Sequence, residues 1–264
     1  LGVAHAQGEI VLFTDADCEP TQDWIERMAA PLRAEKALHD NEIVGVKGAY
    51  LNRQREIVAR FVQMEYEDKY DHMARERFID FVDTYSAGYR RDVFVANGGF
   101  DPSFSVASVE DQEFSFRLAR QGYKMIFVTE AHVYHWGHAQ DVWAYWRKKF
   151  KIGYWKVVVC RQHPGKVWQD SHTPQVLKGQ ILLAGLGGLC FLGGFLWSPM
   201  MWGIAVSGLS FLLTALPFIL KTWGRDPLVA LVSPGLLLVR ALALGTGFAR
   251  GLAANLATRS IFGI

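Results

Sequence analysis

The chain has 264 residues, half of them hydrophobic, and its 28 basic and 26 acidic residues give a formal net charge of +2. Of these, 25 acids and 22 bases fall in residues 1–172, so the first part is mildly acidic and the rest basic and apolar. A mildly acidic domain repels a phosphate backbone, so nucleic-acid binding is disfavoured. Three scattered cysteines form neither a disulfide framework nor a zinc spacing, which suits a reducing, cytosolic environment.

The first residues lead into an apolar strand that ends in two acids. Residues 2–8 are typical of the end of a helix, and residues 9–14 are predicted to form the strand. Because an α/β domain needs strands before this one, we expect the chain to be N-terminally truncated. Asp15 and Asp17 follow the strand. In an extended segment, side chains at i and i+2 share a face, so both carboxylates are expected to point the same way at a sheet edge. Such a pair suits a divalent cation that also holds phosphate oxygens.

Strands and helices then alternate, which indicates an α/β layer fold. Cys18 follows the acidic pair, but its neighbours form no nucleophile arrangement, so an inert thiol is expected. Gly122 is expected to end a helix in the left-handed conformation. The predicted elements are a helix at 22–36, a strand at 42–51, a helix at 54–76, a strand at 80–90, a short helix before Gly98, a helix at 110–121 and a strand at 123–129.

Two further features could carry chemistry. Glu110 and Asp111 open a predicted helix, where acids also have the ordinary explanation that they complement the helix dipole. His135 lies just past a predicted strand and could bind a metal, although a single histidine is more often structural. Each of these signals is weak alone, as is an Asp-x-Asp pair.

The second part of the chain indicates a membrane protein. Residues 143–156 combine aromatic and basic side chains, which suits a membrane interface, the alternative being a basic helix on a soluble surface. We therefore expect a catalytic domain at 1–139, an amphipathic interfacial segment at 140–176 and a membrane region at 177–264.

A long uncharged run follows. The 42 residues between Lys178 and Lys221 include no charged residue, and about 20 residues are enough for one membrane span. Ser198-Pro199 breaks the run near its middle. This pattern predicts a helical hairpin at 179–197 and 201–220.

A third apolar segment, residues 228–249, is interrupted by Pro234 and Arg240. An intramembrane arginine often marks function, but its side chain can equally extend to the interface. The positive-inside rule places the bases around the hairpin on the cytosolic side. If the third segment spans, Arg250 and Arg259 lie on the opposite side. A re-entrant or in-plane segment avoids this, and the sequence leaves both alternatives open.

Taken together, the motifs closely resemble the family 2 glycosyltransferases of the GT-A fold. The resemblance covers residues 1–138 in motif detail, and the apolar segments are similar to those of membrane-bound members. It implies a GT-A-like α/β domain, a nucleotide-sugar donor, Mg2+ or Mn2+, and inversion at the anomeric carbon. The segments that carry it are Ala6–Cys18, Tyr89–Phe94, Gly98–Asp101, Glu110-Asp111, Arg117-Leu118 with Gly122, and His135.

The resemblance also implies roles for individual residues. Asp15 would lie near the nucleotide or metal, and Asp17 would ligate the metal bound to the diphosphate. Asp111 would be the general base that takes the acceptor's hydroxyl proton, with Glu110 beside it. His135 would be a further contact to the metal or diphosphate. This agrees with the chemistry, because the leaving diphosphate gains charge that a cation stabilises, and the incoming hydroxyl needs a carboxylate.

The chain departs from the family in two places. The pocket for the nucleotide base would precede Leu1, so the donor's base and sugar cannot be read. Processive synthases carry a Gln-x-x-Arg-Trp motif, which residues 145–155 do not match, so transfer of one or a few sugars is expected.

The functional hypothesis is an inverting glycosyltransferase in the cell inner (cytoplasmic) membrane, multi-pass, with its catalytic domain cytosolic. Its acceptor would be a lipid-linked or envelope-glycan molecule, and the truncated chain is expected to be inactive without its missing start. The alternative is a non-catalytic membrane scaffold that retains the glycosyltransferase fold.

Overall fold

The computed structural model describes residues 2–34, 43–104, 109–167 and 174–262, and these form two compact units. The α/β unit consists of Leu1–Gln54, Glu65–His138 and Val159–Thr173, and the helical unit consists of Arg55–Met64, Ala139–Val158 and Pro174–Ile264. Helices α3 (Ile57–Met73) and α6 (Val142–Gln162) each contribute residues to both units.

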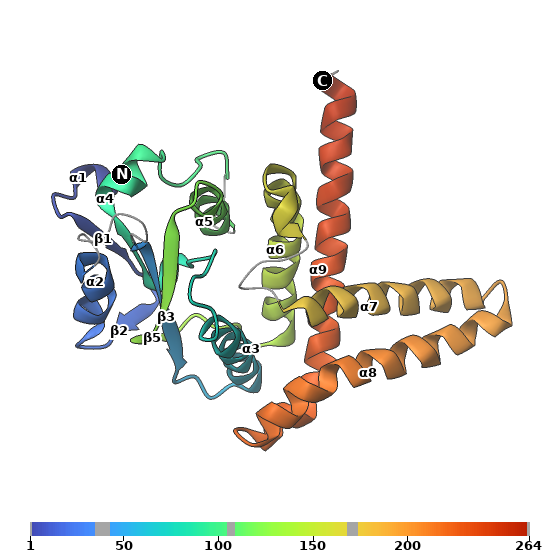
Figure 1. Ribbon diagram of the computed structural model, residues 1–264. Coiled ribbons are helices and arrows are strands. Elements are labelled where there is room, and N and C mark those ends of the chain that lie inside the picture. The colour runs from blue at the N-terminus through green and yellow to red at the C-terminus, as the bar shows by residue number, and fades with distance from the viewer. Residues whose placement is uncertain (1, 35–42, 105–108, 168–173, 263–264) are drawn as a thin grey trace. The chain divides into compact units, whose positions relative to one another are not determined.

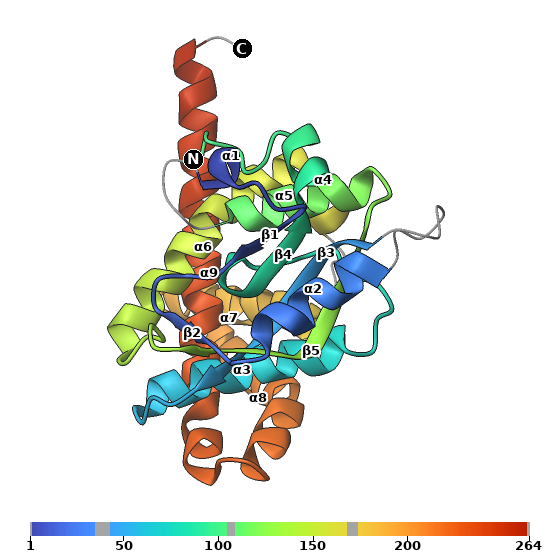
Figure 2. The same cartoon turned by 90° about the vertical axis from the view of Figure 1, so that its left-hand side faces the viewer.

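A five-stranded mixed sheet forms the centre of the α/β unit (Figure 2). Its strand order is β1-β4-β3-β5-β2, with β3 and β5 parallel and the other neighbours antiparallel. The mixture of strands and helices confirms the expected α/β class. The strands are β1 (Ile10–Phe13), β2 (Cys18–Pro20), β3 (Ile43–Asn52), β4 (Ala87–Arg90) and β5 (Lys124–His135).

The core forms around β3, in which every residue from Ile43 to Tyr50 is buried. A strand covered on both faces has no need of alternating polar residues, and this one is almost continuously apolar. Helix α2 (Trp24–Ala34) packs against the sheet through Trp24, Met28 and Leu32, which recur every four residues and are buried. The indole N–H of Trp24 donates to the Ser86 hydroxyl over 2.8 Å. The last two residues predicted for this helix, 35–36, lie outside the described residues.

The remaining elements of the α/β unit follow the predicted order. Gly122 follows α5 with φ +90°, so the predicted left-handed helix end is confirmed. The short elements and α5 are α1 (Gly2–His5), η2 (Thr84–Ser86), α4 (Arg91–Ala96), α5 (Glu110–Arg120) and η3 (Pro164–Val167).

Two expectations about the strands were wrong. The strand predicted at 80–90 is confined to β4, because residues 84–86 form the 3-10 helix η2. The sequence predicted a strand at 123–129, but β5 continues to His135 because a bulge shifts its register against β3 between Lys47 and Ala49 and pairing then resumes. Strand β2 was not predicted. The three-residue β2 lies at the edge of the sheet, where its closing residue, Pro20, is tolerated.

The helical unit contains α7 (Gln175–Gly194), η4 (Ser198–Met200), α8 (Met201–Trp223) and α9 (Pro227–Phe262). The α7–α8 hairpin turns at Ser198–Met200, as predicted. Pro234 and Arg240 interrupt the apolar pattern of α9 but not its helix. Three helices are long and apolar enough to cross a membrane, within Gln175–Gly194, Ser198–Trp223 and Pro227–Leu256, which indicates membrane association.

Candidate active site

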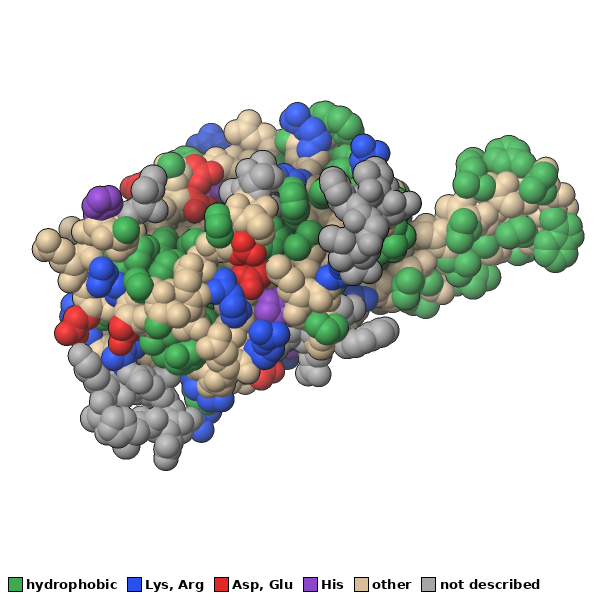
Figure 3. All heavy atoms as spheres, turned by 90° about the horizontal axis from the view of Figure 1, so that it is seen from above, with side chains coloured by type: hydrophobic (Ala, Val, Ile, Leu, Met, Phe, Trp, Pro, Cys, Tyr) green, Lys and Arg blue, Asp and Glu red, His purple; other side chains and the backbone are tan. Residues whose placement is uncertain are grey.

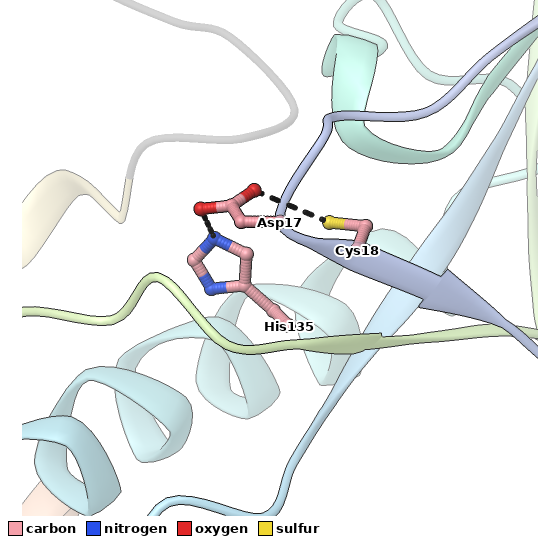
Figure 4. Close-up of side chains that lie close together, drawn as sticks. All are labelled: Asp17, Cys18 and His135. Atoms are coloured by element: carbon pink, nitrogen blue, oxygen red, sulfur yellow. Dashed lines mark hydrogen bonds and ion pairs between the residues drawn. The ribbon is translucent and has the colours of Figure 1, made fainter.

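The pairing of β2 with β5 creates the candidate metal centre. Cys18 lies opposite His135 in this antiparallel pair, and the Trp136 N–H donates to the Asp17 carbonyl over 2.9 Å. The side chains of Asp17, Cys18 and His135 consequently converge, with potential ligand atoms all within 4.8 Å of one another (Figure 4). The structure thus brings together two residues predicted from the sequence, Asp17 and His135, and adds Cys18.

His138 and Gln54 support the contact between Asp17 and His135. Asp17 Oδ2 lies 3.3 Å from His135 Nε2, and His135 Nδ1 lies 2.8 Å from Nδ1 of His138. Gln54 holds His138 by accepting from its backbone N–H (2.9 Å) and donating to its carbonyl (3.3 Å). In the tautomer with Nε2 of His135 unprotonated, its Nδ1–H donates to Nδ1 of His138, which is the arrangement that orients a ligating histidine.

The donor set fits a divalent cation. Asp17 supplies carboxylate oxygens and His135 an imidazole nitrogen, and both groups are common ligands of divalent metals. Burial, and then the charges of Asp17 and Asp15, raise the pKa of Cys18 to about 12. Without a bound metal, the thiol therefore stays protonated at neutral pH. Asp17 and His135 are the residues of this cluster, predicted from the sequence, that could hold the metal.

Asp15 lies differently from the expectation. The backbone at residues 14–17 is not extended, because Ala16 and Asp17 form a turn in which the Cys18 N–H donates to the Asp15 carbonyl over 3.0 Å. The argument that Asp15 and Asp17 share a strand face is therefore wrong. Among the described residues, the candidate ligand cluster does not include Asp15, whose side chain is exposed.

Tyrosines line the inner side of the centre. The ring of Tyr50 stacks on Tyr85 at 3.5 Å between centroids and lies 4.3 Å from the ring of His135. Tyr66 stacks on His138 at 5.8 Å. The Tyr50 N–H donates to the Tyr70 hydroxyl, which also shares a hydrogen bond with Tyr85, each over 2.8 Å. These contacts fix the aromatic rings and, through them, the orientation of the two histidines.

Asp111, the predicted base, lies in the first turn of α5 and is half-buried. Its carboxylate accepts from the Gln112 N–H (2.7 Å) and, more weakly, from the Thr84 N–H (3.4 Å). Burial, and then the charge of Glu110, raise the pKa of Asp111 to about 7. A carboxylate with such a pKa accepts and releases a proton near neutrality, as a general base must.

A buried lysine supports this region and was missed in the sequence. Lys47, on β3, is fully buried, forms an ion pair with Asp83, and lies 4.8 Å from the centroid of the Tyr85 ring. Burial lowers its pKa, and its charge lowers the pKa of Asp111. The sequence did contain a signal for this residue, namely a single base within the apolar run Val44–Leu51. A lysine in a buried strand needs a partner for its charge.

The charges of Asp15 and Asp111 both affect the pKa of Tyr66. Burial has the largest effect on the raised pKa of Tyr66, and the charges of Asp111 and Asp15 add to it. Tyr66 is therefore within electrostatic range of both the predicted base and the acidic turn.

The motif around Arg117 has a structural role. Arg117 pairs with Glu113 at 2.7 Å and donates to the Gly99 carbonyl at 2.8 Å and to the Asn97 carbonyl. Gly98 and Gly99 adopt φ +75° and +64°, the region that favours glycine. Arg117 therefore fixes the glycine turn against α5, which carries Asp111.

Comparisons with known proteins bear on this site. Residues 1–96 match the family described as "Glycosyl transferase family 2". The chain is 26% identical over 155 residues to "Probable N-acetylgalactosaminyltransferase 6" of Caenorhabditis elegans, across 51% of this chain and 24% of the relative, so it spans about a quarter of that protein's length.

Among solved structures, the chain is similar to "Mannosyltransferase PcManGT from Pyrobaculum calidifontis in complex with GDP-Man and Mn2+". The TM-score is 0.46 at 15% identity, over 95% of this chain and 64% of the other. A TM-score below 0.5 does not establish a common fold.

The family match includes β1, the turn with Asp15 and Asp17, β3 and β4, and it agrees with the observed α/β architecture. Residues 1–96 are therefore similar to a family 2 glycosyltransferase domain and form part of a mixed α/β sheet.

Proposed function

We propose that the chain is a glycosyltransferase that transfers a sugar from a nucleotide-sugar donor with inversion at the anomeric carbon. One observation carries the proposal: the α/β unit, whose residues 1–96 match this family, holds two carboxylates in contrasting environments, Asp17 beside an imidazole and Asp111 with a pKa near 7. The first environment suits a cation and the second suits a proton acceptor.

The donor would bind at the end of β1. Asp17 and His135 would hold Mn2+ or Mg2+, which when bound neutralises charge on the leaving diphosphate. The imidazole favours Mn2+ over Mg2+, because Mg2+ prefers oxygen ligands. Asp15, exposed in the same turn, would contact the nucleotide or its metal.

Asp111 would take the proton of the acceptor hydroxyl as that oxygen attacks the anomeric carbon, with burial and then the charge of Glu110 keeping the pKa of Asp111 high. A single displacement needs one base and inverts the configuration. The apolar helices support an acceptor held at a membrane, namely a lipid-linked or envelope-glycan molecule at the cytosolic face of the inner membrane.

The test uses the full-length protein that contains this chain, purified in lipid nanodiscs. Release of nucleoside diphosphate from a panel of nucleotide sugars is measured with Mn2+, with Mg2+ and with chelator. Metal-dependent release is expected from one donor, and Asp17→Asn and Asp111→Asn are each expected to reduce it about 100-fold or more.

Asp92→Asn is the matched control, because Asp92 lies on the exposed side of α4 with a 72% exposed side chain. If Asp17→Asn and Asp111→Asn both keep the turnover of the control, the assigned roles are wrong. If calorimetry shows that the protein binds neither Mn2+ nor any nucleoside diphosphate, the non-catalytic scaffold is the better description.

A further inference from the structure

The path of α9 through the helical unit resolves the alternatives that the sequence left open for the third apolar segment. The Arg240 guanidinium donates to Gln180 Oε1 over 2.8 Å, and Gln180 Nε2 contacts the Thr214 hydroxyl at 3.4 Å. Gln180 is near the start of α7 and Thr214 is in the second half of α8. The middle of α9 therefore lies beside the base of the hairpin and not beside its tip.

Helix geometry shows that α9 crosses the hairpin. At 1.5 Å per residue, Arg240 is about 20 Å from the start of α9, whereas its partner Gln180 is only about 8 Å from the start of α7. Five residues further along α9, a Cβ at Gly245 would lie 3.2 Å from Cγ2 of Ile181. The contact thus moves by one residue on α7 while α9 advances by about 7 Å. A helix upright beside α7 would meet residues progressively nearer the hairpin tip.

The base of the hairpin is its charged end. Asp226, in the α8–α9 turn, accepts from Nε (2.8 Å) and NH2 (2.6 Å) of Arg60 on α3. Lys178 and Lys221 flank the uncharged run at this end. At the opposite end, Leu196 and Trp202 are 93% and 77% exposed. Figure 3 shows the hairpin as a hydrophobic surface without charged side chains at its end.

The second half of α9 is in backbone contact with α6. A Cβ at Gly247 would lie 2.2 Å from the Phe150 carbonyl oxygen, and a Cβ at Gly251 would lie 2.4 Å from that of Tyr154. A Cβ at Gly153 of α6 would in turn lie 2.4 Å from the Leu244 carbonyl oxygen. The two helices lie side by side in Figures 1 and 2, and in Figure 1 the hairpin runs across them.

Helix α6 fixes the depth of this contact. Its exposed bases include Arg147, Lys148 and Lys151, on the same turns as the contact with α9. Charged side chains at the centre of a bilayer are costly, but they are favourable among anionic headgroups. This argues that the part of α9 that packs on α6 lies outside the centre of the bilayer, at a level that suits these bases.

We infer that α9 lies in the plane of the membrane, at the interface that carries α6, and that only the α7–α8 hairpin enters the bilayer. The exposed face of α9 then lies against the lipids, at the boundary between headgroups and acyl chains. This face is apolar along the helix, whereas Arg240 is about 160° away around it at 100° per residue. The exposed residues on the face are Leu231, Leu238, Leu252 and Leu256.

The charge distribution agrees with this placement. An upright α9 would carry Arg250 and Arg259 across to the side of the uncharged turn at Ser198–Met200, against the positive-inside rule. An in-plane α9 keeps every base of the second part on one side.

Depth measurements on the full chain in anionic vesicles test the inference. Single cysteines that replace Leu231, Leu238 and Leu252 carry a nitroxide, in a background with the three native cysteines changed to alanine. An in-plane helix gives three equal depths at the interface. An upright helix places Leu238 near the bilayer centre, about 10 Å deeper than Leu231.

The matched control is the same measurement on α7. Val176 and Leu186 are exposed and ten residues apart, so nitroxides there are expected to differ in depth by about 15 Å. If the α9 labels change depth as the α7 labels do, the inference is overturned. Since this comparison uses no activity, its failure would leave the proposed reaction intact.

A second measurement determines sidedness. Cysteines that replace Ser198, Gly224 and Arg250 are treated with a membrane-impermeant maleimide in sealed vesicles of each orientation. Labelling of positions 224 and 250 from one side and of position 198 from the other is expected. Labelling of position 250 from the same side as position 198 means that α9 spans the bilayer.

Discussion

The two carboxylates of the proposed site show how one fold places the same functional group in two environments. Asp17 precedes a three-residue edge strand, its side chain is 48% exposed, and its neighbour is an imidazole. Asp111 opens an eleven-residue helix, is half-buried beside Glu110, and has a pKa raised to about 7. An edge leaves a carboxylate open to a cation, whereas a packed helix end reduces its hydration and makes it a proton acceptor.

The contrast between the two carboxylates is tested most strongly by replacing the buried one, Asp111. Asp111→Asn keeps the size of the side chain and one of its two hydrogen bonds from backbone N–H groups, but it cannot accept a proton. We expect a loss of about 10²–10⁴-fold in kcat with little change in the KM for the donor. Steady-state kinetics on the identified donor measure it, and an equal loss from Asp92→Asn would show that the effect is not specific to the base.

Metal binding at the exposed carboxylate, Asp17, is expected to depend on His138, which contacts His135. His138→Ala removes the partner of His135 Nδ1, so we expect Mn2+ affinity to fall about 10–100-fold while nucleotide binding without metal is unchanged. Mn2+ titration by calorimetry tests this. His72→Ala, at an exposed position on α3, is the matched control. Unchanged affinity in His138→Ala would show that His138 does not orient His135 for metal binding.

Substitution of Lys47 tests the contribution of a buried ion pair to stability. Lys47→Met leaves Asp83 without the ammonium group with which it pairs in the protein interior, so we expect a loss of about 3–5 kcal/mol in the free energy of unfolding. The double variant Lys47→Met/Asp83→Asn is expected to recover part of it. Denaturation of the detergent-solubilised protein measures both, and no recovery would mean that the ion pair is not the cause.

The smallest effect expected is a shift in the pH profile. Because Asp111 acts as a base only when deprotonated, turnover should rise with pH through about 7 and level off above it. The charge of Glu110 contributes to the raised pKa, so Glu110→Gln should lower the pKa and move the rising limb to lower pH. A limb that stays in place would show that Glu110 has no such influence on the titrating group.

The sequence predicted the elements that follow from hydrophobic periodicity. β1, β3 and α5 lie close to their expected positions because their apolar patterns follow from burial, and the α7–α8 hairpin does so because a long uncharged run is broken at Ser198-Pro199. The course of residues 14–20 was not predictable in this way, because a turn and a three-residue edge strand have no period. The contact of His135 with Asp17 depends on that strand, so its geometry required the register of β2 against β5.

The supporting residues were missed for a different reason. Lys47 and the tyrosines at positions 50, 66, 70 and 85 come from three separate elements, and their contacts are set by how β3, α3 and η2 pack together. Local patterns carry no information about such tertiary contacts. The roles of Asp15, Asp17, Glu110, Asp111 and His135 remain predictions that the experiments above address.

The aromatic tip of the hairpin has a consequence for where in a cell this protein can reside. Trp197 and Trp202 are 64% and 77% exposed on either side of the turn, and tryptophans prefer the level of the headgroups. The 20 residues of α7 separate these rings from the basic end by about 30 Å, the usual thickness of a hydrocarbon core. With the hairpin inserted as inferred above, a thinner or thicker bilayer would tilt it or strain its ends, so we expect the protein to favour membranes whose hydrocarbon core matches this length.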